Sequence, residues 1–205
     1  LPKSQGLPRE VPSLDALPEF PFTTPQMLSE HPGRYLATSQ AQVSRVISGA
    51  TSGTTGPAKR VFYTDTDTEH TVGFFAAGIS EMLSKGEKCL IAFPFTGLVE
   101  DTHPETYIGF PVTLLGLARM YREELPIQRA LVSGDACPKG VMTELEKMLG
   151  SKLYPHYGSR ECGLGGAVTC SAHKGMHLRE NHIIAEIIDE NGNVQPDGEY
   201  GELVI

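Results

Sequence analysis

A loop of glycines and hydroxyl residues that ends in a lysine is the stretch of this sequence best suited to chemistry. It runs from Ser48 to Lys59 as Ser-Gly-Ala-Thr-Ser-Gly-Thr-Thr-Gly-Pro-Ala-Lys. Glycines let backbone N–H groups turn toward a polyanion, hydroxyls donate hydrogen bonds to its oxygens, and the lysine adds a positive charge. The loop therefore predicts a phosphate site, with the backbone of glycines such as Gly53 and Gly56, the hydroxyls of Thr51, Ser52, Thr54 and Thr55, and Lys59 as candidate ligands.

Two other interpretations of this loop fit its sequence less well. A Walker P-loop needs Gly-Lys followed directly by Ser or Thr, whereas Lys59 follows Ala58 and precedes Arg60. A flexible linker has a similar composition, but apolar runs that predict strands flank the loop at 43–47 and 60–63. We therefore favour phosphate binding and keep the linker as the alternative.

Two more short motifs follow along the chain. The first is Ser133-Gly134-Asp135-Ala136-Cys137, and the second is Tyr157-Gly158-Ser159-Arg160-Glu161. Taken alone, Tyr157 would be an ordinary aromatic residue at a strand end and Glu161 a solvated surface carboxylate. The order of the three motifs is what favours a functional interpretation.

In this order the three motifs resemble those of the adenylate-forming superfamily, which includes acyl-CoA synthetases, nonribosomal peptide adenylation domains and luciferases. The spacing from Gly56 to Lys59 matches, although the proline that usually precedes the lysine is displaced to Pro57. The lead-in 17–22 and the tail 177–189 resemble the phenylacetate-coenzyme A ligase branch in particular. The resemblance implies the α/β AMP-binding core of that family.

The resemblance implies an acid-thiol ligase that joins a small-molecule carboxylic acid to the α-phosphate of ATP. The acyl group of the acyl-adenylate then passes to coenzyme A, and relatives of this branch often pair as homodimers. Lys59 and Glu161 are the implied catalytic residues, with Glu161 as the Mg²⁺ ligand. The implied nucleotide-binding residues are Ser52, Thr54, Thr55 and Lys59 at the β- and γ-phosphates, Ser159 at the α-phosphate, and Ser133, Gly134, Asp135, Tyr157 and Gly158 around AMP. A noncatalytic adenylate- or acyl-binding module is the alternative.

Aromatic residues at two predicted strand ends suggest an acyl pocket. Phe93 and Phe110 follow apolar runs that predict buried strands, and parallel sheets place ligands at such ends. An aromatic lining would suit a flat substrate, such as an aryl acid. The alternative is that both side chains belong to the core.

Four potential zinc ligands occur close together, with the spacing Cys-x7-Cys-x2-His-x3-His. They are Cys162, Cys170, His173 and His177, and a structural zinc site takes four such ligands in a tetrahedron. Glu180 or His182 could replace Cys162. Two buried thiols with two surface histidines are the alternative, and a zinc-stabilised interaction domain would be the corresponding function.

The elements that must position these motifs alternate between strand and helix. Apolar runs at 89–93, 107–110 and 129–132 predict buried strands. Helical spacing follows Asp67 and Pro111 and recurs over 138–149, so we expect a mainly parallel, helix-covered sheet. The runs at 183–188 and 201–205 flank a turn signal and predict a small antiparallel unit.

Three segments follow from this pattern. We expect a proline-rich lead-in over 1–34, the α/β AMP-binding core over 35–180, and the start of a β subdomain over 181–205. The resemblance places the mobile C-terminal lid domain, with the lysine that drives adenylation, beyond Ile205. The chain is therefore expected to be the large-domain core of a ligase.

The composition argues against nucleic-acid and membrane partners. The 17 Lys and Arg residues face 25 Asp and Glu residues, which gives a formal charge of −8 without a basic run. No apolar stretch approaches the roughly 20 residues that a membrane helix needs, and the N-terminus lacks a signal-peptide layout. We therefore expect a cytoplasmic protein.

Overall fold

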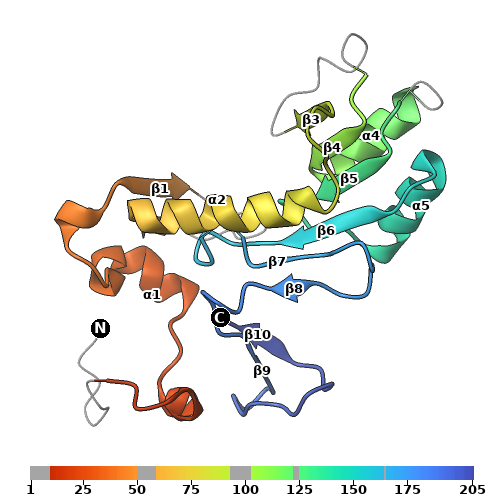
Figure 1. Ribbon diagram of the computed structural model, residues 1–205. Helices are drawn as coiled ribbons and strands as arrows, with labels where there is room; N and C mark the ends of the chain where they lie inside the picture. Colours follow the sequence, from red (N-terminus) through yellow and green to blue (C-terminus); the bar gives the residue numbers. More distant parts are fainter. Residues whose placement is uncertain (1–9, 50–58, 93–102, 122–124, 164) are drawn as a thin grey trace. The chain divides into compact units, whose positions relative to one another are not determined.

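A computed structural model describes residues 10–49, 59–92, 103–121, 125–163 and 165–205 (Figure 1). These residues form two compact units. One consists of Leu1–Asp65 with Glu180–Ile205, and the other of Thr66–Arg179. The three segments predicted from the sequence have different boundaries from these two units, and the division into three segments stays a prediction.

The second unit is built on a six-stranded sheet with the order β3-β4-β5-β6-β7-β8 (Figure 1). Strands β3 to β6 pair in parallel, and β7 and β8 continue the sheet antiparallel. The mainly parallel sheet expected from the sequence is therefore confirmed. The strands are β3 (Cys89–Ala92), β4 (Thr106–Gly109), β5 (Arg129–Val132), β6 (Leu153–Tyr157), β7 (Ala167–Val168) and β8 (His177–Leu178).

Helices α4 (Pro111–Tyr121) and α5 (Lys139–Leu149) cover one face of this sheet. Proline opens α4, where it fits because the first helical N–H has no partner within the helix. Gly150 ends α5 in the left-handed region, with φ 66. Leu114 of α4 and Leu145 of α5 are fully buried in the core on this face.

The opposite face packs against the end of α2 (Asp65–Ser80). Within β5, Ala130 and Val132 belong to the core under α4 and α5, whereas Leu131 packs with Met82 on the other face. This alternation follows the two-residue period of a strand, and it explains why all of β5 is apolar except Arg129. The helix expected to begin near Asp67 begins two residues earlier, since Asp65 is its first residue.

The other unit contains two antiparallel pairs, which are β1 (Arg45–Gly49) with β2 (Lys59–Tyr63) and β9 (Glu186–Ile188) with β10 (Glu202–Val204). The second pair confirms the expected antiparallel unit. In its described residues, the proline-rich lead-in forms short elements, which are the 3-10 helices Leu14–Glu19 and Pro32–Tyr35 and α1 (Pro25–Glu30). A further 3-10 helix, Gln40–Gln42, follows the lead-in.

Candidate functional site

Two of the three motifs meet at the carboxyl edge of the parallel sheet. Strands β5 and β6 pair in parallel, so the segments that follow them leave the same edge. Ser133 Oγ lies 2.7 Å from His156 Nδ1, which joins the turn after β5 to the end of β6. Ligands of α/β sheets bind at this edge. The structure therefore brings the Ser133–Asp135 motif next to the strand that carries Tyr157.

The turn after β5 presents backbone and carboxylate to solvent. The Ser133 N–H donates to the Gly109 carbonyl oxygen at 2.9 Å, which fixes the turn to β4. Gly134 has φ 80, a conformation that favours glycine, and both Gly134 and Asp135 are exposed. Asp135 Oδ1 accepts a hydrogen bond from the Ala136 N–H at 2.8 Å. The turn is thus ordered, with Gly134 and Asp135 on its exposed outer edge.

His156 is a member of this site that the sequence analysis missed. Its side chain is buried, with 9% exposed, and the Phe75 and Phe74 rings lie 5.1 and 6.2 Å from it between centroids. Burial lowers the pKa of His156 to about 4, so the imidazole is neutral near pH 7. The one available signal was its place directly before Tyr157, inside a strand whose other residues are mostly apolar.

The segment after β6 carries the remaining motif residues. Tyr157 and Gly158 are exposed, and Glu161 is exposed four residues after Tyr157. Burial of part of its ring raises the pKa of Tyr157, and the nearby Cys162 and Glu161 raise it further. Ser159 Oγ donates to Cys162 Sγ at 3.2 Å. An exposed carboxylate fits Mg²⁺, which keeps several waters and takes one or two protein carboxylates together with substrate phosphates.

One part-buried and one buried hydrogen bond hold this segment in place. Thr71 Oγ1 of α2 donates to the Gly163 carbonyl oxygen at 2.6 Å, and an Arg179 guanidinium N–H donates to the Cys162 carbonyl oxygen at 3.3 Å. Arg179 is only 5% exposed and lies over the Phe74 ring, 5.6 Å from its centroid. Gly165 has no room for a Cβ because the Phe74 ring occupies that space. Position 161 is therefore fixed by residues far away in the sequence.

The phosphate loop can be placed only through its last residue. Lys59 is the first residue of β2 and pairs with Gly49 of β1, so the loop connects two antiparallel strands. Lys59 is half-buried. The other expected ligands of this loop lie outside the described residues: Thr51, Ser52, Gly53, Thr54, Thr55 and Gly56.

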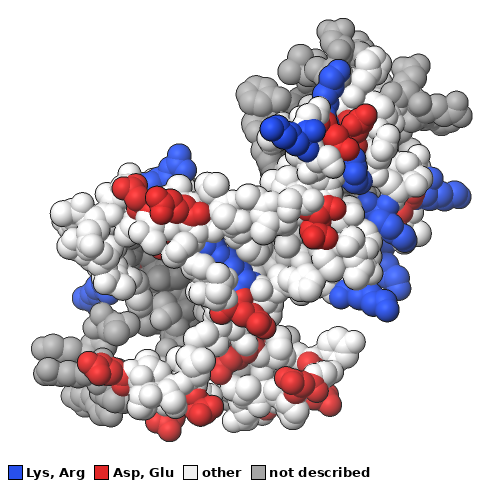
Figure 2. Space-filling view, in the orientation of Figure 1, with Lys and Arg blue, Asp and Glu red and all other residues white. Residues whose placement is uncertain are grey.

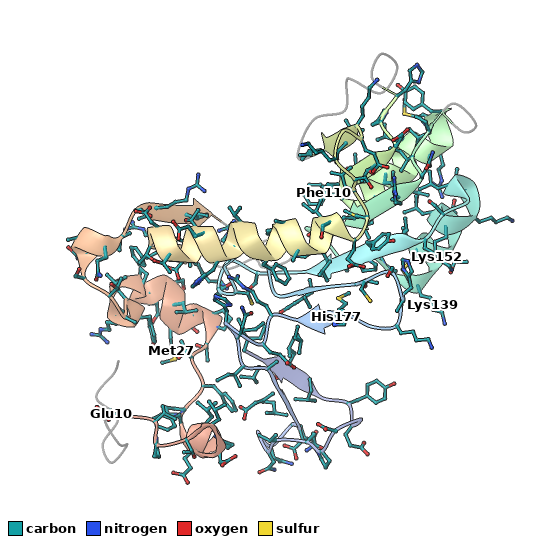
Figure 3. All side chains as sticks on the ribbon, viewed as in Figure 1. Glu10, Met27, Phe110, Lys139, Lys152 and His177 are labelled. Atoms are coloured by element: carbon teal, nitrogen blue, oxygen red, sulfur yellow. The ribbon has the colours of Figure 1, made fainter. Side chains whose placement is uncertain are left out.

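Of the two expected pocket phenylalanines, Phe93 lies outside the described residues and Phe110 follows β4 directly (Figure 3). Phe110 is half-buried, and its carbonyl oxygen accepts a hydrogen bond from the Tyr107 hydroxyl at 2.9 Å. Because β4 is the neighbour of β5 in the parallel sheet, Phe110 leaves the same edge as Ser133. Its role in acyl binding stays a prediction.

The structure does not assemble the expected zinc site. Cys162 is buried against Ser159, while the His173 ring packs on Tyr154 with 4.7 Å between the centroids. His177 is exposed in β8 (Figure 3), and Cys170 is half-buried. Among the described residues, no three His, Cys, Asp or Glu side chains are grouped so that they could hold a metal ion. His177 lies in β8 and the other three residues precede it along the chain, and Cys162 and His173 pack with different neighbours.

Charged side chains of both signs lie on the face drawn in Figure 2. Lys and Arg form small groups there and Asp and Glu form others, with no broad patch of one sign. Within the part of the chain that the structure describes, no helix combines the length and apolar character of a membrane span.

Comparison with known proteins agrees with these motifs. The chain is 26% identical to the phenylacetate-coenzyme A ligase of Pseudomonas putida, with 96% of this chain and 54% of that protein covered. The Escherichia coli (strain K12) phenylacetate-coenzyme A ligase is 25% identical with the same coverage. A mitochondrial acyl-coenzyme A synthetase of Rattus norvegicus, ACSM4, is 25% identical over 65% of this chain. The chain thus spans about half the length of the curated phenylacetate ligases that it matches.

Solved structures share the fold. An open conformation of 2-hydroxyisobutyryl-CoA ligase in complex with 2-HIB-AMP and CoA matches with a TM-score of 0.72 and 15% identity, covering 90% of this chain and 54% of that one. O-succinylbenzoate coenzyme A synthetase from Bacillus subtilis, in complex with AMP, matches with a TM-score of 0.57 and 17% identity over 78% of this chain and 40% of that one. The resemblance to adenylate-forming enzymes of the phenylacetate-ligase-like branch is therefore confirmed. Because the family model for AMP-binding enzymes matches residues 65–205, more than half of its length, the chain belongs to the AMP-binding enzyme family.

Proposed function

We propose that this chain is the nucleotide-handling core of a ligase that activates a carboxylic acid with ATP and transfers the acyl group to coenzyme A. The observation that supports this most directly is the joining of two motifs at one sheet edge, through the 2.7 Å contact between Ser133 and His156. Family membership and the phenylacetate-coenzyme A ligases among its relatives give the reaction class.

Four residues of the unit that contains β5 and β6 have suitable positions along this edge. Gly134 and Tyr157 are exposed on the segments that leave β5 and β6, where a planar base could lie against backbone and ring. Ser159 and Glu161 follow, which suits the α-phosphate and its metal. Mg²⁺, when bound by Glu161, offsets negative charge on the transferring phosphate. Lys59, at the end of the phosphate loop, adds a positive charge for the β- and γ-phosphates.

The acyl side of the reaction is inferred from fewer residues. Phe110, and Phe93 by its sequence position, would give an aromatic lining that favours an aryl or aromatic acyl substrate. Coenzyme A is the proposed acceptor because the relatives named above are coenzyme A ligases. The homodimer and the cytoplasmic location stay predictions.

The first test is calorimetric titration of the chain with ATP in the presence of Mg²⁺. Wild type should bind saturably, and both Lys59→Ala and Glu161→Ala should weaken binding about 10- to 100-fold, because each loses an interaction with a charged group. Lys152→Ala and Glu144→Ala are the matched controls. Both controls are surface residues in exposed ion pairs, so affinity should not change.

Repeating the titration without Mg²⁺ separates the two roles. The Glu161 variant should then match wild type, while the Lys59 variant should still bind more weakly. A folded wild type that binds neither ATP nor AMP would contradict the proposed function. Equal affinity of the Glu161 variant and wild type in Mg²⁺ would contradict the role of that carboxylate alone.

A further inference from the structure

Helix α2 lies along the residues that follow β6 (Figure 1). Thr71 Oγ1 is 2.6 Å from the Gly163 carbonyl oxygen. Further along the helix, an added Cβ at Gly165 would overlap an aromatic ring of α2, and one at Gly78 would lie 3.1 Å from the Val168 side chain. These contacts follow the same order in the helix and in the segment, so the two pack side by side.

Glu161 lies in a tight turn at the start of this segment. The Gly163 N–H donates to the Arg160 carbonyl oxygen at 3.2 Å, which closes a turn over residues 160–163. Glu161 is exposed within that turn. Because the turn is closed by its own hydrogen bond, a contact at its last residue also fixes the backbone that carries the Glu161 carboxylate.

Two donors from other elements hold the end of the turn. An Arg179 guanidinium N–H donates to the Cys162 carbonyl oxygen at 3.3 Å, and Thr71 Oγ1 donates to the next carbonyl, that of Gly163. Gly163 has φ 68, and an added Cβ there would lie 3.1 Å from Thr71 Oγ1 and 3.2 Å from the Arg179 guanidinium. The glycine thus lets both donors approach the turn closely.

The Thr71 hydroxyl reaches beyond its own helix. Threonine within a helix commonly donates to the carbonyl four residues earlier, as Thr143 of α5 does to the Lys139 carbonyl oxygen at 2.9 Å. Thr71 Oγ1 also lies 2.9 Å from the Asp67 carbonyl oxygen, but its contact with Gly163 is shorter. A hydroxyl has one proton to donate, and the shorter distance favours the contact with the turn.

We propose that Thr71 is a positioning residue for Glu161, whose carboxylate binds the Mg²⁺ that accompanies ATP. This inference rests on the proposed function and adds a residue of α2 to it. Mg²⁺ demands near-ideal octahedral geometry and takes only one or two protein carboxylates beside the substrate phosphates. A small displacement of the single carboxylate in the turn therefore weakens the metal-dependent part of ATP binding.

The expected effect depends on Mg²⁺. Thr71→Val removes the hydroxyl with little change in the shape of the side chain. In Mg²⁺ it should weaken ATP binding about 3- to 10-fold, the effect of losing one hydrogen bond. Without Mg²⁺ the carboxylate has no metal to hold, so the valine variant should match wild type. A loss of packing alone would weaken binding under both conditions.

Calorimetric titration of the 205-residue chain with ATP, with and without Mg²⁺, is the test. Thr71→Ser keeps the hydroxyl and should retain most of the wild-type affinity in Mg²⁺. Thr143→Val is the matched control, since it makes the same change at a hydroxyl that bonds within its own helix, and its affinity should equal that of wild type. Thr71→Ala removes the same hydroxyl and suits a helix better than valine, so it gives the same test if the valine variant does not fold.

A double variant checks that Thr71 acts through Glu161. Adding Thr71→Val to Glu161→Ala should weaken ATP binding in Mg²⁺ no further, because the carboxylate that Thr71 positions is already absent. If the valine change weakens binding in this background as much as in wild type, Thr71 does not act through Glu161.

The outcomes separate this inference from the proposed function. If wild type binds ATP and Thr71→Val binds it equally well in Mg²⁺, the role of Thr71 is overturned and the proposed function stands. The same holds if the valine variant loses equal affinity with and without Mg²⁺, or if Thr71→Ser loses as much as Thr71→Val. If the folded wild type binds neither ATP nor AMP, both proposals fail.

Discussion

Replacing His156 by glutamine should reduce the loss of stability that the protein suffers on acidification. The pKa of His156 falls from its usual 6.5 to about 4 because the folded protein buries the ring. Below about pH 6.5 the unfolded chain takes up a proton that the folded chain refuses, so acid favours unfolding. His156 therefore lowers the free energy of unfolding as the pH falls from about 6.5 to about 4. Below about pH 4 its contribution no longer changes with pH.

The magnitude follows from the two pKa values. Each unit of difference corresponds to about 1.4 kcal/mol. Between about pH 7 and pH 5 the wild type should lose about 2 kcal/mol of unfolding free energy through His156. The loss should reach about 3 kcal/mol below about pH 4, where the folded protein also binds the proton. Glutamine can still hydrogen bond Ser133 but does not titrate, so the variant should lack this component.

Urea unfolding followed by circular dichroism at several pH values measures the effect. The difference in unfolding free energy between wild type and His156→Gln should change by about 2 kcal/mol over this range, with an unchanged dependence on urea concentration. His177→Gln is the control for the histidine-to-glutamine change itself, because it replaces an exposed histidine in β8. Parallel pH profiles for wild type and His156→Gln would refute the inference that this imidazole is buried and neutral.

Two other predictions concern packing around the site. Gly109→Ala should cost about 1–3 kcal/mol by overpacking, because its Cβ would lie 2.5 Å from the buried Tyr107 hydroxyl. Gly116→Ala in α4, where an added Cβ meets nothing within 4 Å, should raise the free energy of unfolding by about 0.5–1 kcal/mol. Thermal unfolding compares the Gly109 and Gly116 variants, and equal melting temperatures would contradict the argument. Arg179→Met should weaken ATP binding about 10-fold in Mg²⁺ and little without it, since it loosens the segment that carries Glu161. Calorimetry with Arg179→Lys as the conservative variant checks this, and an equal loss without Mg²⁺ would argue against positioning.

Local sequence patterns predicted most of the fold. Buried parallel strands must be apolar on both faces, so β3 and β5 are visible as short apolar runs. Pro111 marks the start of α4 because proline fits the first helical turn. These signals depend only on neighbours in the chain, and the strand boundaries they predicted differ from the structure by at most three residues.

The zinc prediction shows where such patterns stop being informative. Spacing alone allowed Cys162 and His177 to share a metal, but the structure buries the thiol and leaves the imidazole exposed. Ligand geometry depends on where each side chain points, and that direction is set by packing partners in other elements. The sequence lists the ligand types without showing those partners.

By itself, the sequence determined the alternation of strands and helices, the order of the three motifs and, through them, the family. The tertiary structure alone decided which side chains meet: Ser133 contacts His156 across 23 positions of sequence, and Thr71 contacts Gly163 across 92. The reason is physical. Backbone conformation and periodicity reflect local sterics and hydrogen bonding, whereas burial, the low pKa of His156 and the fixing of the Glu161 segment arise only when distant segments exclude water together.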